Sequence, residues 1–150
     1  VSLRAEGDTF LMPGVDAESA SVLVPGHYSL VMHVDVDANS ARICGPVRGG
    51  AEAVMPGAVY AAAGGVGCVV HLHHSAFYSQ LLAGGAPATD ETAMFGTPEL
   101  ARSVAELVCQ HPADGVIALT GYKGGFLVYG QDPGHIRDLI AMLAQGYIPL

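Results

Sequence analysis

The fold of this chain is decided by one stretch, Val69-Val70-His71-Leu72-His73-His74-Ser75. It ends a short apolar, β-branched run from Val66 to Leu72 that follows the turn-forming pair Gly64-Gly65, and such a run is typical of a buried strand. Residues i and i+2 of a strand share a face, so His71 and His73 are expected to point at one spot. Two converging imidazoles are half of a metal site, although half-buried histidines bonded to the backbone show the same spacing.

Length and composition indicate one compact domain spanning 1–150. The chain has 150 residues, of which 51% are hydrophobic and 13% charged, and it contains 20 glycines. That length is enough to bury a sizeable core, and the composition differs from that of disordered or fibrous chains. We therefore expect a globular fold with many tight turns.

The charge and hydropathy patterns exclude two classes of partner. The formal net charge is −8 with only 6 Lys and Arg residues, which leaves no basic face for a phosphate backbone. The longest uncharged run, 53–70, is interrupted by proline and glycine residues that would break a membrane helix. Nucleic acid and membrane are therefore not expected partners.

The cysteine pattern indicates a reducing compartment. Cys44, Cys68 and Cys109 are odd in number, widely spaced and set among apolar neighbours. Buried free thiols fit this pattern better than a disulfide framework or a zinc–thiolate cluster. Although the sequence begins at Val1 rather than at a methionine, no signal peptide is visible, and we expect a cytoplasmic location.

Hydrophobic periodicity predicts strands that alternate with helices. Besides the His strand, strands are expected over 9–12, 30–36, 42–44, 115–120 and 126–129. Helices are expected over 56–63 and 75–83, from Thr97 (as its cap) onward, and from Asp132-Pro133 to the end. Helices separate several of the strands, which favours a layered α/β domain without internal repeats.

The order of these motifs resembles the class II aldolase/adducin family, represented by fuculose-phosphate aldolase and ribulose-phosphate epimerase. The resemblance runs from Val1-Ser2-Leu3-Arg4 to the last helix. It rests on 7–15 (GDTFLMPGV), 69–75 (VVHLHHS), 95–101 (FGTPELA) and 126–132 (FLVYGQD). It implies a class II aldolase-like layered domain with a central, mostly antiparallel sheet flanked by helices, with or without the family's N-terminal helix. It also implies a homotetramer with active sites between subunits.

The resemblance implies a metal-assisted site. Family members hold zinc or a similar divalent cation with three His residues, and a Glu upstream of the His pair is general base or resting-state ligand. His71 and His73 match the pair, Glu52 matches the acid, and Tyr60 follows at the family's spacing. The cation polarises a substrate carbonyl while the carboxylate moves a proton. Zinc is the first expectation, with Fe(II) or Mn as alternatives, and a solvated loop acid is the alternative for Glu52.

The third metal ligand departs from the family pattern. Tyr122 or, in another register, Gly124 stands where the family has its third His. Tyr122 is therefore expected to act as an acid/base group or to fill the coordination sphere. Another His is the alternative, and the candidates are His27, His33, His111 and His135.

The phosphate site also departs from the family pattern. Gly49-Gly50-Ala51 replaces the Ser residues that bind substrate phosphate, with Arg48 beside it. Backbone amides of a Gly-rich loop still bind a carboxylate or small oxyanion, and a solvated role for Arg48 is the alternative. We expect Arg48, Gly49, Gly50 and Lys123 to contact substrate.

Together these features predict a metal-dependent lyase-type enzyme for aldol cleavage, decarboxylation or related enediolate chemistry. Its substrate is expected to be a small, oxygenated, non-phosphorylated molecule. A non-haem iron oxygenase on the same scaffold is one alternative, because two His and a carboxylate are an adequate iron ligand set. A non-catalytic, adducin-like binding module is the other.

Overall fold

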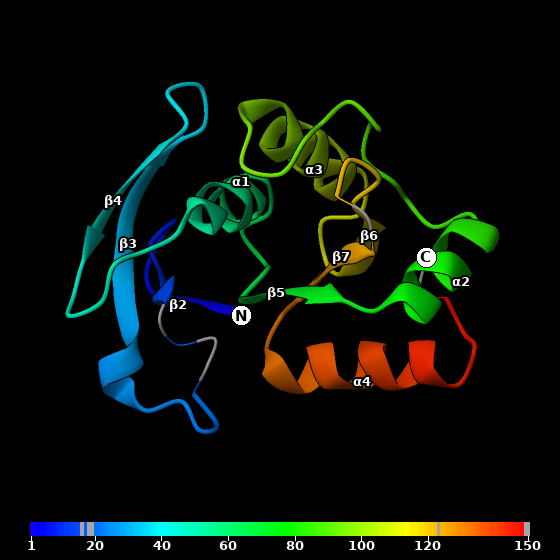
Figure 1. Ribbon diagram of the computed structural model, residues 1–150, viewed down its shortest axis with the longest axis horizontal. Coiled ribbons are helices and arrows are strands. Elements are labelled where there is room, and N and C mark those ends of the chain that lie inside the picture. The colour runs from blue at the N-terminus through cyan, green and yellow to red at the C-terminus, as the bar shows by residue number, and fades with distance from the viewer. Residues whose placement is uncertain (16, 18–19, 123, 149–150) are drawn as a thin grey trace.

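The computed structural model describes residues 1–15, 17, 20–122 and 124–148. Within these ranges the chain forms one seven-stranded sheet in the order β4-β3-β2-β1-β5-β7-β6, and every neighbouring pair is antiparallel (Figure 1). The strands are β1 (Ser2–Arg4), β2 (Phe10–Pro13), β3 (Tyr28–Asp35), β4 (Ser40–Cys44), β5 (Cys68–His73), β6 (Gly115–Ala118) and β7 (Gly125–Gly130). The expected α/β class with a mostly antiparallel sheet is confirmed.

Four α-helices and two short 3-10 turns connect the strands within the described ranges. The helices are α1 (Val54–Ala62), α2 (Ser75–Ala83), α3 (Pro98–Gln110) and α4 (Pro133–Ala144), and the turns are η2 (Pro25–His27) and η3 (Ala51–Ala53). None of these helices combines the length and the apolar character that crossing a membrane requires.

The helix boundaries follow from local capping. Thr97 Oγ1 accepts a hydrogen bond from the Leu100 amide, and Asp132 Oδ1 accepts one from the His135 amide, as is usual for N-cap residues. The helix expected from Pro56 begins at Val54 instead. Proline is tolerated in a first turn because its missing N–H would have no helical partner there, so Pro56 does not mark the start.

Two hydrophobic clusters lie on opposite faces of the β5–β7–β6 part of the sheet, because strand side chains alternate. One face carries Val69, Ile117 and Leu127 and is covered by α1 and α3. The other carries Cys68, Val116 and Phe126 and is covered by α2 and α4 (Figure 1). The His pair lies on the α1–α3 face.

Arg4 fixes α1 against the centre of the sheet. Its guanidinium donates to the carbonyl oxygens of Tyr60 (2.7 Å), Ala63 (2.8 Å) and Val66 (2.6 Å) and stacks over the Tyr60 ring. Carbonyls at a helix C-terminus lack helical partners, so a cation that binds them stabilises the helix end. The contact ties the end of α1 to β1 and to the approach to β5.

The cysteines differ in part from the expectation. All three thiols are free, but only Cys68 is buried, whereas Cys44 and Cys109 are exposed. Cys44 ends the edge strand β4, and Cys109 is in the last turn of α3. Apolar neighbours in sequence do not imply burial there, because successive residues of an edge strand or helix point in different directions.

Candidate active site

The two strand histidines lie next to each other, with their rings in an edge-to-face arrangement. The His71 and His73 ring centroids are 4.7 Å apart with an interplanar angle of 62°. His73 pairs across the sheet with Gly125, where an added Cβ would lie 3.2 Å from His73 Cε1 and 3.3 Å from His71 Nε2. Glycine at position 125 therefore leaves the room that both rings occupy.

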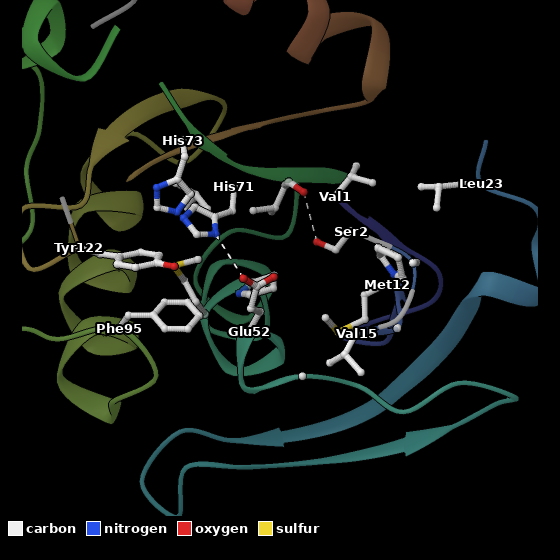
Figure 2. Close-up of a pocket in the computed structure, with 18 residues that line it drawn as sticks. Val1, Ser2, Met12, Val15, Leu23, Glu52, His71, His73, Phe95 and Tyr122 are labelled. Atoms are coloured by element: carbon white, nitrogen blue, oxygen red, sulfur yellow. Dashed lines mark hydrogen bonds and ion pairs between the residues drawn. The ribbon is translucent and has the colours of Figure 1, made fainter. Parts of the chain in front are cut away.

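Glu52 approaches the His pair from η3, the turn that leads into α1. Its Oε1 lies 3.7 Å from His71 Nδ1, which is longer than a hydrogen bond and is an ion-pair contact when the ring is protonated (Figure 2). The neighbouring His71 ring lowers the pKa of Glu52 below its usual range, while partial burial opposes that effect. The carboxylate is consequently favoured in its ionised form.

The other ring nitrogen of His71 is buried. His71 Nε2 has no hydrogen-bond partner among the residues that the structure describes. A buried polar atom of this kind is costly unless a ligand, an ion or water satisfies it. An ion or ligand that reached His71 Nε2 would give this atom the partner that it lacks among the described residues.

The donor set is of the type that binds divalent metals, but it is not closed. Two imidazoles and the Glu52 carboxylate are the donor types that zinc and iron use. No group of three or more His, Cys, Asp and Glu side chains in the described part of the chain is arranged to hold a metal ion. Glu52 lies on the Nδ1 side of His71, away from the buried Nε2.

Tyr122 and Phe95 form the aromatic wall of the site. Their rings stack with centroids 4.4 Å apart and an interplanar angle of 24°, and the Tyr122 ring meets His73 edge-on at 4.5 Å. The Tyr122 amide donates to the Leu119 carbonyl at 2.9 Å, which holds the turn between β6 and β7. Figure 2 shows the phenol oxygen pointing inward, toward the side of the pocket where Glu52 and His71 lie.

These side chains line one end of a cavity of about 600 Å³. Gly50 and Pro56 also line it, and so do residues of β1, β2 and the turn after β2. Volumes of this order are typical of small-molecule sites. The structure thus brings together four residues of the sequence-predicted site, namely Glu52, His71, His73 and Tyr122, and places Gly50 beside them.

The other expected substrate-binding residues lie elsewhere. Arg48 and Gly49 line a separate hollow beside β4, formed with Ala41, Ile43 and Val47. Gly49 packs against Ile43, because an added Cβ would overlap Ile43 Cδ1. Lys123 lies outside the described residues.

None of the four alternative histidines lines the cavity. His27 Nδ1 accepts a hydrogen bond from the Val24 amide, and His33 is exposed on β3. His111 follows α3 at the surface, and His135 Nε2 lies 2.8 Å from Asp114 Oδ2. The His135–Asp114 pair links α4 to the segment before β6.

Sequence reasoning missed the aromatic and apolar walls of the cavity. Phe95 stands in a motif that marks the start of α3, and nothing local reveals that its ring stacks on Tyr122. Met12 and Val15, from β2 and the following turn, line the cavity at its other end. The only signal for them is the run Met12-Pro13-Gly14-Val15, which resembles a family turn.

Comparisons with known proteins show the fold. The chain superposes on the crystal structure of YgbL from Klebsiella pneumoniae, a candidate aldolase/epimerase/decarboxylase, with a TM-score of 0.70 and 15% identity over 97% of this chain and 73% of that one. YgbL from Escherichia coli, described in the same words, gives a TM-score of 0.61 and 17% identity over 97% of this chain and 74% of the other. No protein-family model and no curated protein sequence matches the chain.

Proposed function

We propose that this chain is a lyase-type enzyme that removes and returns a proton beside the carbonyl group of a small oxygenated substrate. The observation that carries the proposal is the convergence of Glu52, His71, His73 and Tyr122 on one end of a single cavity. Aldol cleavage, decarboxylation and epimerisation share this proton-transfer chemistry. The names given to the YgbL proteins belong to the same group of reactions and support the assignment.

His71 and His73 are the residues that would hold a divalent cation, zinc first and Fe(II) or Mn as alternatives. His71 Nε2 supports this role, because it is buried without a hydrogen-bond partner in the described part of the chain and would gain one when an ion binds. A bound cation would supply electrostatic stabilisation of negative charge that develops on the substrate oxygen. Since the donor set is not closed, we expect binding to be weaker and more exchangeable than at a site of three imidazoles.

Glu52 is the group that accepts the substrate proton. It is ionised at neutral pH, lies at the rim of the His pair and has a side chain that is 45% exposed, so substrate can reach it. A positioned base must lie within hydrogen-bond reach of the proton that it takes, and the cavity beside Glu52 offers that place. The protonated carboxyl returns the proton on the same face or releases it to water.

Tyr122 is the matching acid. Its phenol oxygen faces the space between the His pair and Glu52, and its ring is held by the stack with Phe95. A hydroxyl in this position donates a proton or a hydrogen bond to the substrate oxygen. Glu52 and Tyr122 therefore act on the substrate as base and acid.

Exchange of the substrate α-proton with D₂O, followed by ¹H NMR, tests the step that all these reactions share. A simple α-hydroxy ketone is the probe, and the protein is supplied with Zn²⁺, Mn²⁺ or, without oxygen, Fe²⁺. We expect exchange that Glu52→Gln slows about 10²- to 10⁴-fold. Glu106→Gln, at an exposed position on α3, is the matched control and is expected to exchange like the parent.

Three results would overturn this proposal. Proton exchange that persists at the parent rate in Glu52→Gln would show that Glu52 is not the base. If no cation supports proton exchange and calorimetry detects no cation binding, the cavity is a binding pocket without this chemistry. Oxygen consumption with Fe²⁺ in place of proton exchange would support the oxygenase instead.

A further inference from the structure

We infer that the substrate is an α-hydroxy ketone or aldehyde that carries an uncharged alkyl or aryl tail, and that the end of the cavity opposite the His pair binds this tail. The inference rests on the proposed function, since it names the substrate class of that same site. It is carried by the unequal chemistry of the two ends of one cavity. We call the tail-binding end, formed by Met12, Val15 and Leu23, the apolar arm.

The two ends of the cavity lie on either side of Glu52. His73 and Tyr122 lie to one side of it in Figure 2, whereas Met12, Val15 and Leu23 lie to the other. Met55 and Val69 also line the cavity and add apolar surface. If the substrate carbonyl lies at the His pair, the rest of the substrate therefore lies against apolar side chains.

No Lys or Arg side chain lines the cavity among the described residues, and Glu52 supplies negative charge. The one amino group among these lining residues is that of Val1, and burial lowers its pKa below the ordinary value of 8.0, which disfavours the charged form. Arg4 is committed to the carbonyl oxygens at the end of α1, and Arg48 lines the separate hollow beside β4. A phosphate or carboxylate on the tail would therefore lie here without a cationic side chain to balance it, which is unfavourable.

The backbone of the apolar arm does not replace a cation. The Gly14 amide donates to the His27 carbonyl at 2.9 Å and the Val15 amide to the Arg48 carbonyl at 3.1 Å. The Ala17 amide donates to the Gly14 carbonyl at 3.0 Å. Anion-binding loops need free N–H groups that point at the ligand, and these three are already used.

The apolar arm also has surface that a tail would cover. Val15 is 46% exposed and Leu23 is 39% exposed, although both line the cavity. The total volume of about 600 Å³ exceeds what a three-carbon substrate fills. Burial of each additional methylene is worth about 0.8 kcal/mol, which corresponds to an approximately fourfold lower Kd.

Isothermal titration calorimetry with a homologous series tests the inference on the full chain. The probes are hydroxyacetone, 1-hydroxy-2-butanone, 1-hydroxy-2-hexanone and 2-hydroxyacetophenone, with dihydroxyacetone phosphate as the charged comparison. We expect Kd to fall about fourfold for each added methylene. Dihydroxyacetone phosphate is expected to bind no more tightly than hydroxyacetone.

A pair of neighbouring substitutions locates the effect. Leu23→Lys places a cation in the apolar arm and is expected to abolish the dependence on tail length and to favour the phosphate. Val22→Lys makes the same charge change on the adjacent residue, which is 70% exposed and does not line the cavity, and is expected to bind like the parent. Both positions are exposed, so folding is expected to be retained.

The outcomes separate this inference from the proposed function. A Kd that is flat along the series, or tightest for the phosphate, overturns the inference even where proton exchange occurs. A Kd that falls with tail length supports it even where no exchange is seen, in which case the proposed function alone fails. If Kd is flat along the series, and the parent is an oligomer whereas Leu23→Lys is a monomer, a second copy of the chain covers the apolar arm. That result would also overturn the inference.

Discussion

The two faces of the β5–β7–β6 sheet are built on the same strands and differ in what they contain. Facing α2 and α4, Cys68, Val116 and Phe126 lie in a continuous apolar cluster. Facing α1 and α3, the same strands contribute His71 and His73 to a cavity of about 600 Å³. A shift of one residue along a strand therefore separates a position that stabilises the fold from one that serves the site.

This difference follows from what covers each face. Both faces carry a hydrophobic cluster, but α2 and α4 lie directly over theirs, which Figure 1 shows for α4 beneath β5 and β7. On the opposite side Glu52 approaches from η3 and Tyr122 from the turn before β7, while Met55 and Pro56 in the first turn of α1 also line the cavity. The Glu52 and Tyr122 side chains are thus supplied by turns, whereas α1 supplies apolar lining.

The largest expected effect compares a buried residue of one face with an exposed residue of the other. Phe126 is 0% exposed and faces α2 and α4, so Phe126→Ala should lower the free energy of unfolding by about 3–5 kcal/mol. His73→Ala, on the neighbouring strand but facing the cavity, should cost about 1 kcal/mol or less in the metal-free protein. Urea denaturation of both variants measures the difference, and equal losses would show that the two faces do not divide stability and function as we describe.

Sequence reasoning succeeded where the governing forces act over a few residues. The alternation along 69–75 placed both histidines on one face, and Thr97 and Asp132 cap helices as their hydrogen-bonding groups predict. The position of Glu52 came from the family resemblance, and its approach to His71 depends on how η3 packs over β5. A periodic pattern contains no information of that kind.

The parts that the sequence did not reveal depend on contacts between distant segments. Arg48 and Gly50 are close in sequence, yet only Gly50 lines the cavity, because Gly49 packs on Ile43 of β4 and turns the chain. The apolar arm joins β2 and the loop before η2 to a site built on β5. These juxtapositions follow from the strand order, which becomes known only when the sheet is assembled.

A second prediction uses pH, because two buried phenols lie on the site face. Burial raises the pKa of Tyr60 and of Tyr129 to about 12, from the ordinary value of 10.0. Their stabilising contribution is complete below pH 10 and is lost as the pH rises toward 12, because the unfolded chain ionises first. Each contributes about 3 kcal/mol to that loss.

Tyr60→Phe should remove about half of the alkaline loss of stability, although it also removes the hydrogen bond between Tyr60 and Ser2. The measurement is the free energy of unfolding at intervals between pH 8 and 12. Tyr147→Phe, at a position that is 64% exposed, is the control and should follow the parent curve. A parent stability that stays constant over this range would mean that Tyr60 is hydrated, and that the site face is less tightly packed beneath the cavity than we describe.

A third prediction fills the space that Gly125 leaves open, and its expected effect on stability is smaller than that of Phe126→Ala or of the phenol titration. An added Cβ would lie 2.9 Å from the Tyr122 carbonyl oxygen, 3.2 Å from His73 Cε1 and 3.3 Å from His71 Nε2. Gly125→Ala therefore has to shift the two imidazoles or the Tyr122 turn, at a cost of about 2 kcal/mol in unfolding free energy. Because the groups that move belong to the site, proton exchange should fall by more than the stability change explains.

The matched control is Gly64→Ala, since no atom lies within 4 Å of the Cβ added there. It should change both stability and exchange little, because it alters a surface turn that touches neither face of the sheet. Proton exchange and metal affinity that persist unchanged in Gly125→Ala, with the fold intact, would show that the His pair tolerates displacement. The close approach of β7 to His71 and His73 would then serve packing alone, and the functional distinction between the two faces would rest on Glu52 and Tyr122.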